Sequence, residues 1–210
     1  MTLIDLLTER GHPTRLRPGA ILFHEGDRAS VVYGVVSGRV RIEATTPTGG
    51  RLVLAMKEPG DVLGELGALD GRPRSATAVA VEPVELVQVG VDDFLAALAD
   101  QPRHAVLLLQ RISRDLRDSV ERTTARASAD ATQRLAMLLL DLAERYGEHT
   151  ETTIEIDLSL TQDDMAGWIG ATREATARSL RTLREQGCVA TGRRRISITD
   201  LDALRSAALG

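Results

Sequence analysis

The chain is poor in the residues that mark several common classes of protein. Cys188 is the only cysteine among 210 residues, which excludes a disulfide within the chain and a cysteine-ligated iron–sulfur cluster. The four histidines are scattered without the spacing of metal ligands, so we expect no metal and no haem. No apolar run reaches the ~18 residues of a membrane span, and no signal-peptide pattern is present. We therefore expect a cytoplasmic protein that does not contact a membrane.

Aromatic residues and lysine are also scarce. Aromatic side chains make up 2% of the chain and hydrophobic residues 43%, so any packed core must be aliphatic. Lys57 is the only lysine beside 25 arginines, a bias that we interpret as a sign of a GC-rich genome and not of function. The net charge of −4 does not indicate a nucleic-acid partner, but residues 171–198 hold seven arginines and only two glutamates. This basic segment predicts contact with nucleic acid near the C-terminus.

The first hundred residues carry a β pattern after one short helix. The helix is expected over residues 2–10 and ends at Gly11. Short apolar runs separated by turn residues then predict strands over residues 20–23, 31–36, 39–45, 51–56, 76–81 and 84–89. Many short strands at this spacing are typical of an antiparallel roll or barrel, a fold that leaves room inside for one small ligand.

A stretch before the last two predicted strands places an acid near an arginine. Glu65 follows Gly64 in a segment that we expect to be too rich in glycine for a stable helix. Nine residues later, Arg74 precedes Ser75. The guanidinium offers a planar fork of donors for a phosphate, while the serine hydroxyl and nearby backbone amides could complete an anion cradle. Glu65 supplies the acceptor that a ribose hydroxyl needs. A pair of surface charges without function is the alternative.

From residue 92 the pattern becomes helical. A short amphipathic helix is followed by a long one, which begins at Pro102 and runs to about residue 126. Alternating steps of three and four residues predict a coiled-coil seam at Leu109, Ile112, Leu116, Ser119 and Thr123. A strip this narrow on a helix this long predicts pairing with a second copy in a homodimer. The alternative is packing of the helix on its own domain.

The C-terminal third predicts two short helices joined by a tight turn. Asp130 should cap a helix over residues 131–146, and the hinge between domains is expected here. Thr161 with Asp164 resembles a capping box, and Gly170 begins the turn to a second helix capped by Thr172. A basic hairpin follows, with arginines at its tip. Two helices in this order, with arginine and glutamate at the start of the second, are suited to insertion into the major groove.

Two segments resemble one family. The letters GELGAL followed by RSAT closely resemble the phosphate-binding cassette of cyclic-nucleotide-binding domains. The letters TREATAR resemble the SRETVGR recognition helix of the cyclic-AMP receptor protein (CRP/FNR) family of bacterial transcription factors. The resemblance covers nearly the whole chain. It implies an α+β fold with an antiparallel β-roll for cyclic nucleotide (1–101), a dimerisation helix with a hinge (102–129) and a winged helix-turn-helix (130–210).

The resemblance also implies ligand contacts. The expected cyclic-nucleotide site comprises Gly64, Glu65, Leu66, Arg74, Ser75, Ser119 and Val120. Ser119 stands where the family's receptor has a residue facing the adenine. Val120 stands where that receptor has a second hydroxyl, contributed by the partner subunit. The effector is expected to be cyclic AMP, although Val120 weakens the case for strict selectivity.

The implied DNA contacts lie in the second short helix and the hairpin, which matches the wing of a winged helix. They are Thr172, Arg173, Glu174, Arg178, Arg181, Arg193 and Arg194. Ala175 replaces a threonine of the family pattern, so one contact is lost. We expect a palindromic operator with GTGA-like half-sites, and RNA polymerase as a further partner.

These observations predict a homodimeric regulator of transcription, not an enzyme, in which the cyclic nucleotide shifts the dimer to its DNA-binding state. One alternative is a constitutive DNA-binding regulator of the same fold that binds no nucleotide. Another is an enzyme with a cupin-like metal site, which would need clustered histidines and carboxylates. His24 is the only histidine in the region of the roll interior.

Overall fold

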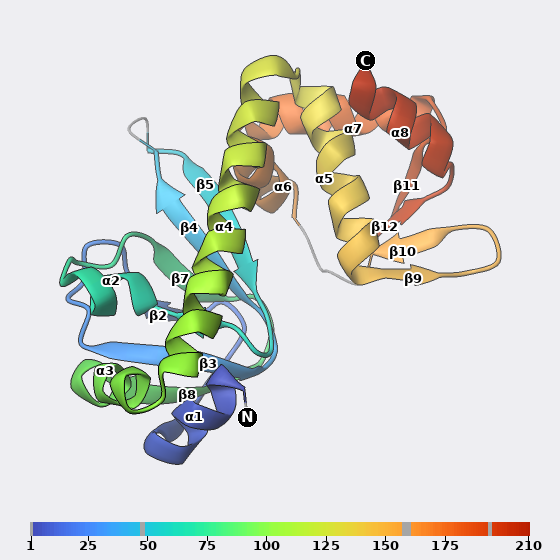
Figure 1. Ribbon diagram of the computed structural model, residues 1–210. Coiled ribbons are helices and arrows are strands. Elements are labelled where there is room, and N and C mark those ends of the chain that lie inside the picture. Colours follow the sequence, from blue (N-terminus) through green and yellow to red (C-terminus); the bar gives the residue numbers. More distant parts are fainter. Residues whose placement is uncertain (1, 47–48, 157–160, 193–194) are drawn as a thin grey trace. The chain divides into compact units, whose positions relative to one another are not determined.

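The computed structural model describes residues 2–46, 49–156, 161–192 and 195–210 (Figure 1). The chain divides into two compact units, residues 1–119 and 120–210, and the division falls inside a single long helix, α4 (Pro102–Ser128).

Unit 1 is built on two four-stranded antiparallel sheets. Their strand orders are β1-β8-β3-β6 and β2-β7-β4-β5. The strands are β1 (His12–Leu16), β2 (Ile21–Phe23), β3 (Val31–Ser37), β4 (Val40–Thr45), β5 (Arg51–Lys57), β6 (Val62–Leu63), β7 (Thr77–Ala80) and β8 (Val84–Gly90). The predicted antiparallel roll is confirmed, with β1 and β6 as strands that the sequence pattern did not predict. A cluster of buried aliphatic side chains, including Val35, Val40 and Leu86, forms the core that the composition requires.

Four helices complete unit 1. They are α1 (Leu3–Arg10), α2 (Glu65–Asp70), α3 (Val91–Asp100) and the first part of α4. Leu6, Leu7 and Phe94 are fully buried where α1 and α3 cover β3 and β8 (Figure 1). Leu108 of α4 joins the same cluster, so α4 is anchored to this unit by apolar packing.

Helix α2 corrects an expectation. The segment around Glu65 was predicted to be too glycine-rich for a helix, yet Glu65–Asp70 is helical. Gly64 and Gly71 lie outside the helix at its two ends, both in the left-handed region that favours glycine. Gly67 lies inside, where a Cβ atom would come within 2.5 Å of the Ala29 side chain. Tertiary packing of α2 therefore overrides its poor helix propensity.

Unit 2 holds the expected pair of short helices. Its elements after α4 are α5 (Ala131–Tyr146), β9 (Gly147–His149), β10 (Ile154–Ile156), α6 (Gln162–Ile169), α7 (Arg173–Glu185), β11 (Val189–Gly192), β12 (Arg195–Ile198) and α8 (Leu201–Leu209). The sheet order is β11-β12-β10-β9. Asp130 caps α5 through a capping box, as predicted, and α5 contacts α6, α7 and α8. Cys188 is a buried free thiol, which packs as a small apolar side chain.

Candidate functional site

The guanidinium of Arg74 is buried beneath the loop that precedes α2. Its residue is only 5% exposed, and its Nη1 donates a hydrogen bond to the Gly64 carbonyl at 2.9 Å. Its Nη2 donates to the Val31 carbonyl, and the cation lies 4.3 Å from the centroid of the Phe23 ring. The buried Nε has no hydrogen-bond partner, and no described carboxylate lies within ion-pair distance of Arg74. Buried charges are normally paired, so an arginine buried without a described carboxylate beside it is unusual.

Gly64 is required by this arrangement. Its φ of +78° lies in the region that favours glycine. A Cβ atom at this position would lie 1.9 Å from Nη1 of Arg74, which is closer than any real contact. The absence of a side chain at Gly64 therefore lets the backbone approach the guanidinium of Arg74.

Glu65 begins α2 directly after this glycine. It is 8% exposed, and burial raises the pKa of its carboxyl group above the ordinary value. The positive charge of Lys57 is the strongest opposing influence on that pKa, ahead of Arg74. A buried acid and a buried arginine are thus brought into one neighbourhood, as the nine-residue spacing suggested.

The remaining residues of the expected nucleotide site are accessible. Ser75 is exposed between Arg74 and the start of β7, and Leu66 is exposed on α2. Ser119 and Val120 are exposed on α4 at the boundary between the two units.

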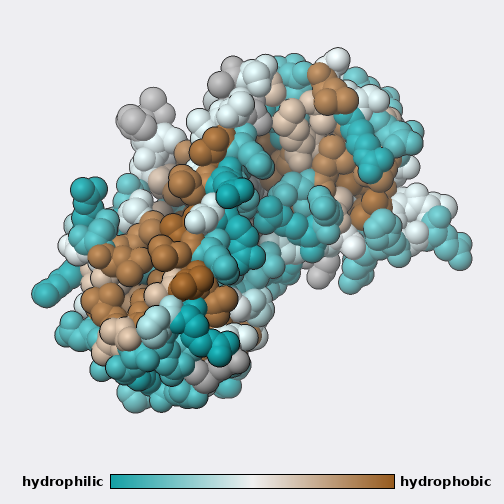
Figure 2. Space-filling model, viewed as in Figure 1, coloured by the Kyte–Doolittle hydropathy of each residue, from teal (hydrophilic) through white to brown (hydrophobic). Residues whose placement is uncertain are grey.

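The seam predicted for α4 needs a correction of register. Ile112 packs against the core of unit 1 and does not face outward. Leu109 and Leu116 of the predicted seam are exposed, at 60% and 64%. The other exposed apolar residues along α4 are Val106, Leu107 and Val120. Val106, Leu109, Leu116 and Val120 follow one another at three, seven and four residues, so they share one face of the helix. Figure 2 shows hydrophobic surface over this part of α4 and over α2, where Leu66 and Leu69 are also exposed.

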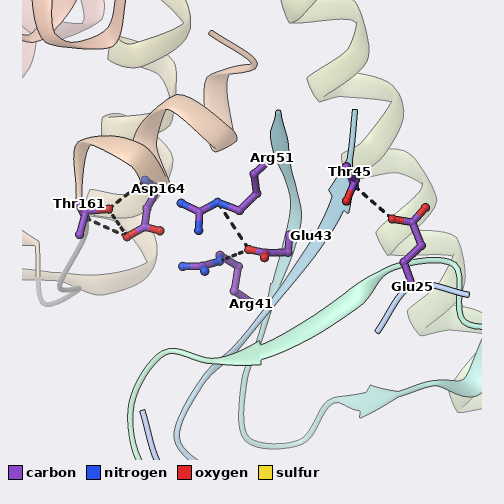
Figure 3. Close-up of polar contacts among 7 residues, drawn as sticks. All are labelled: Glu25, Arg41, Glu43, Thr45, Arg51, Thr161 and Asp164. Carbon is purple, nitrogen blue, oxygen red and sulfur yellow. Dashed lines mark hydrogen bonds and ion pairs between the residues drawn. The ribbon is translucent and has the colours of Figure 1, made fainter. Parts of the chain in front are cut away.

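Helices α6 and α7 form the expected helix-turn-helix. The Thr161 hydroxyl and the Asp164 carboxylate make the predicted capping box at the start of α6 (Figure 3). Gly170 ends α6 with a φ of +62°, and the Thr172 hydroxyl accepts a hydrogen bond from the Ala175 amide at 3.1 Å. The turn between the helices is therefore fixed by Gly170 at the end of α6 and by the Thr172 cap at the start of α7.

Helix α7 separates a buried face from a charged one. Thr176, Leu180 and Leu183 are buried. The exposed residues at its start and on its outer face are Arg173, Glu174, Arg178 and Arg181. Arg173 is held only by a 3.7 Å ion pair to Asp163, which is itself exposed. The basic face is thus open to a ligand, because surface pairs of this kind are weak.

Strands β11 and β12 pair as the antiparallel hairpin expected for the wing. Thr191 lies opposite Ile196, and Gly192 lies opposite Arg195. Arg195 makes a 3.1 Å ion pair with Glu155 of β10. Arg193 and Arg194, which are predicted to contact phosphates, lie outside the described residues.

One buried charge is absent from the residues predicted for the site. Lys57, at the end of β5, is 6% exposed and its Nζ lies 2.6 Å from Oδ2 of Asp115 on α4. No local pattern in the sequence predicted this pair, because its two residues lie 58 positions apart.

Within residues 2–46, 49–156, 161–192 and 195–210, no group of three or more His, Cys, Asp or Glu could hold a metal ion. Within the same ranges, no helix is both long and apolar enough to span a membrane.

Comparison with known proteins finds a matching family model in each of the two units. Residues 13–101 match the family model of the cyclic nucleotide-binding domain, and residues 133–207 match the Crp-like helix-turn-helix domain. The cyclic AMP receptor protein of Thermus thermophilus is 32% identical over 93% of this chain and 88% of its own length. The CRP-like cAMP-activated global transcriptional regulator of Mycobacterium tuberculosis is 29% identical over 96% of this chain and 90% of its own.

A solved structure supports the fold. The c-di-GMP responsive global regulator of Xanthomonas campestris has a TM-score of 0.85 at 24% identity, covering 94% of this chain and 98% of that one. The chain belongs to the CRP/FNR family of transcription regulators. Its helix-turn-helix domain makes DNA its partner.

Proposed function

We propose that the protein is a sequence-specific regulator whose affinity for DNA is gated by a cyclic nucleotide, with cyclic AMP as the first candidate. The observation that carries this proposal is the buried guanidinium of Arg74, which has no carboxylate partner among the described residues. A cyclic phosphate diester carries one negative charge and would complete that pair. A neutral or cationic effector would leave the buried charge uncompensated.

Each expected contact has a chemical role in this proposal. Arg74 binds the cyclic phosphate, assisted by the hydroxyl of Ser75 and the main chain around Gly64 and Leu66. Glu65 accepts a hydrogen bond from the ribose 2′-hydroxyl. Ser119 faces the base, and Val120 packs against it from the second subunit.

The DNA half of the proposal needs two copies of the chain. The apolar stripe on α4 pairs with its symmetry mate, because a stripe of this size is otherwise left in water. The two α7 helices then enter successive major grooves ~34 Å apart. Arg173, Glu174 and Arg178 read bases of a GTGA-like half-site, while Arg181 and the wing arginines contact phosphates. RNA polymerase is the further partner expected of such a regulator.

Gating requires that the nucleotide bind the two states of the dimer unequally. A full change from 1:99 to 99:1 needs a differential affinity of ~5.5 kcal/mol. Contacts to α4 are the natural source of this difference, because α4 continues from the roll into unit 2.

A second candidate is a constitutive regulator of the same fold. Val120 favours it, since an apolar side chain replaces a hydroxyl at a position expected to contact the base. A cyclic dinucleotide is a further possible effector, given the solved structure from Xanthomonas campestris.

Titration calorimetry with cyclic AMP, cyclic GMP and c-di-GMP separates these candidates. We expect saturable heat with cyclic AMP. Heat with c-di-GMP alone would show that the effector is a cyclic dinucleotide. No heat with any of the three nucleotides would favour the constitutive regulator.

The DNA half is tested by Arg178→Ala, with Arg184→Ala near the end of the same helix as the matched control. Fluorescence polarisation on operator and scrambled duplexes should show lost discrimination only for Arg178→Ala, by roughly 1–3 kcal/mol. Equal discrimination in both variants would mean that α7 is not the reading helix.

A further inference from the structure

One arginine of unit 2 contacts the ends of two helices at once. The guanidinium of Arg134 on α5 donates from Nε to the carbonyl of Ile169 at 2.8 Å and from Nη1 to the carbonyl of Ala129 at 2.6 Å. Ile169 is the last residue of α6, and Ala129 directly follows α4. A single side chain therefore bridges the ends of α4 and α6.

The carbonyl of Ile169 lies where a helix has no amide of its own to offer. The last carbonyl groups of a helix lack an intrahelical donor, and a positive charge beside them is favourable. The amides of Gly170 and Ala171 both donate to the carbonyl of Ala166 instead. Ile169 is itself buried, so the guanidinium of Arg134 satisfies an acceptor that the end of α6 would leave inside the domain.

The second carbonyl lies between α4 and α5, in Ala129 and Asp130, which we call the hinge segment. In a helix that continued through this segment, the amide of Gln133 would donate to the carbonyl of Ala129. Here that amide donates to the Asp130 carboxylate at 2.9 Å, in the cap of α5. Arg134 takes the place of the missing backbone donor. The same side chain thus stabilises the break between α4 and α5 and the end of α6.

The reading helix α7 follows α6 after a turn of only residues 170–172. A second polar contact joins the same elements, because the hydroxyl of Thr132 on α5 donates to the hydroxyl of Ser179 on α7 at 3.1 Å. Helix α5 packs against both α6 and α7 (Figure 1). The helix-turn-helix is therefore tied to the hinge segment through side chains of the first turn of α5.

We propose that Arg134 is a positioning residue for operator recognition: by bonding the hinge segment to the end of α6, it holds the two reading helices of the dimer at the separation that a palindrome requires. This inference rests on the proposed function, because it needs two copies of the chain on one duplex. Arg134 reads no base and acts through α7. Its planar fork matters, since it can donate to two acceptors at once. Without it, the helix-turn-helix keeps its own caps but pivots about the hinge segment.

Operators with altered half-site spacing test this role. The duplexes carry two inverted GTGA half-sites, with centres about 10 bp apart or moved about 2 bp further apart. Fluorescence polarisation is measured on the full chain with cyclic AMP, for wild type, Arg134→Met and Arg134→Lys. We expect wild type to prefer the shorter spacing about tenfold or more, because the protein or the duplex must deform to fit the longer one. The preference should fall to about threefold or less in both variants, because methionine has no donor and the lysine ammonium lacks the fork.

Discrimination within one half-site separates positioning from folding. Changing one base pair in each GTGA should weaken both Arg134 variants by the wild-type factor, within about twofold, because the side chains of α7 that read bases are unchanged. The matched control is Arg145→Met on the same helix, since Arg145 pairs with Asp141 of α5 itself. This control should keep the wild-type spacing preference.

A spacing preference that survives in Arg134→Lys or Arg134→Met would overturn the inference. Equal loss of spacing and base discrimination would overturn it too, because that pattern indicates an α7 that has lost its structure. Each quantity is a ratio of two affinities of one preparation, so an unfolded fraction cancels. Wild type that binds neither duplex, or binds both alike, would instead refute the proposed recognition of a palindrome by a dimer.

Discussion

Replacing Arg74 with methionine separates ligand binding from folding more cleanly than any other change in the chain. The substitution keeps an unbranched apolar stem beside the Phe23 ring but removes the buried charge. In the free protein it leaves the carbonyl groups of Gly64 and Val31 without their donor. It also removes a cation that has no counter-ion among the described residues.

The two effects on stability oppose each other. Two unsatisfied buried carbonyls together cost about 2–6 kcal/mol, whereas removal of an unpaired buried charge is favourable by several kcal/mol. We therefore expect the free energy of unfolding of Arg74→Met to lie within about 2 kcal/mol of the wild-type value. Ligand binding has no such compensation. Two charge-assisted hydrogen bonds to the phosphate contribute about 1.5–3 kcal/mol each, so affinity should fall by a factor of 10² to 10⁴.

Thermal unfolding with and without cyclic AMP reports both quantities in one experiment. At a ligand concentration 100 times the wild-type dissociation constant, wild type should gain about 2.7 kcal/mol, and Arg74→Met should gain at most about 0.4 kcal/mol. Arg72→Met is the matched control, because Arg72 is two residues away with its side chain 84% exposed. Ligand stabilisation that survives in Arg74→Met, or is lost in Arg72→Met, would refute the assignment of Arg74.

Three further predictions test other parts of the structure. Gly64→Ala should abolish nucleotide binding, because its Cβ would displace the guanidinium of Arg74; Gly71→Ala has the same left-handed backbone but open space, so calorimetry should show normal binding. Leu116→Glu should dissociate the dimer in sedimentation velocity by placing two charges at the two-fold axis, at a cost on the order of 3 kcal/mol, and a dimer that persists would refute the α4 interface. Burial raises the folded-state pKa of Glu65, so its contribution to stability is fully present below about pH 4.5 and is lost as pH rises through the raised value. Glu65→Gln should therefore be more stable than the free wild type at pH 7 and equal to it near pH 4 in denaturant titrations; equal stability at both pH values would contradict this.

Local signals in the sequence predicted the helix ends well. Thr161, Thr172 and Asp130 all cap helices as expected, because a capping side chain bonds backbone amides two or three residues away and needs no distant partner. Helix α2 escaped prediction for the opposite reason. Its helical state depends on the close approach of Gly67 to Ala29, a contact between residues far apart in sequence.

The same contrast between local signals and long-range contacts explains the seam of α4. Its period is a local property and was predicted, but its orientation was not. Which flank of the apolar strip faces the roll depends on the packing of Ile112 and Leu108 against α1 and α3. The sequence did not predict the burial of Lys57 either, because its partner Asp115 lies 58 residues further along the chain.

The candidate nucleotide site was predicted through the resemblance of a short motif. The spacing of Glu65 and Arg74 alone did not separate a site from two surface charges. The structure adds that both side chains are buried and that Gly64 leaves room for the guanidinium. The roles of these residues stay predictions.

The most direct test of the account measures the affinity of the dimer for a palindromic duplex with GTGA half-sites, with and without saturating cyclic AMP, in wild type and Arg74→Met. At a fixed salt concentration, wild type should bind the duplex at least tenfold more tightly with the nucleotide, while Arg74→Met should bind equally weakly in both conditions. Wild-type affinity that does not respond to cyclic AMP, or an Arg74→Met variant that still responds, would contradict the claim that an anion at Arg74 controls DNA binding.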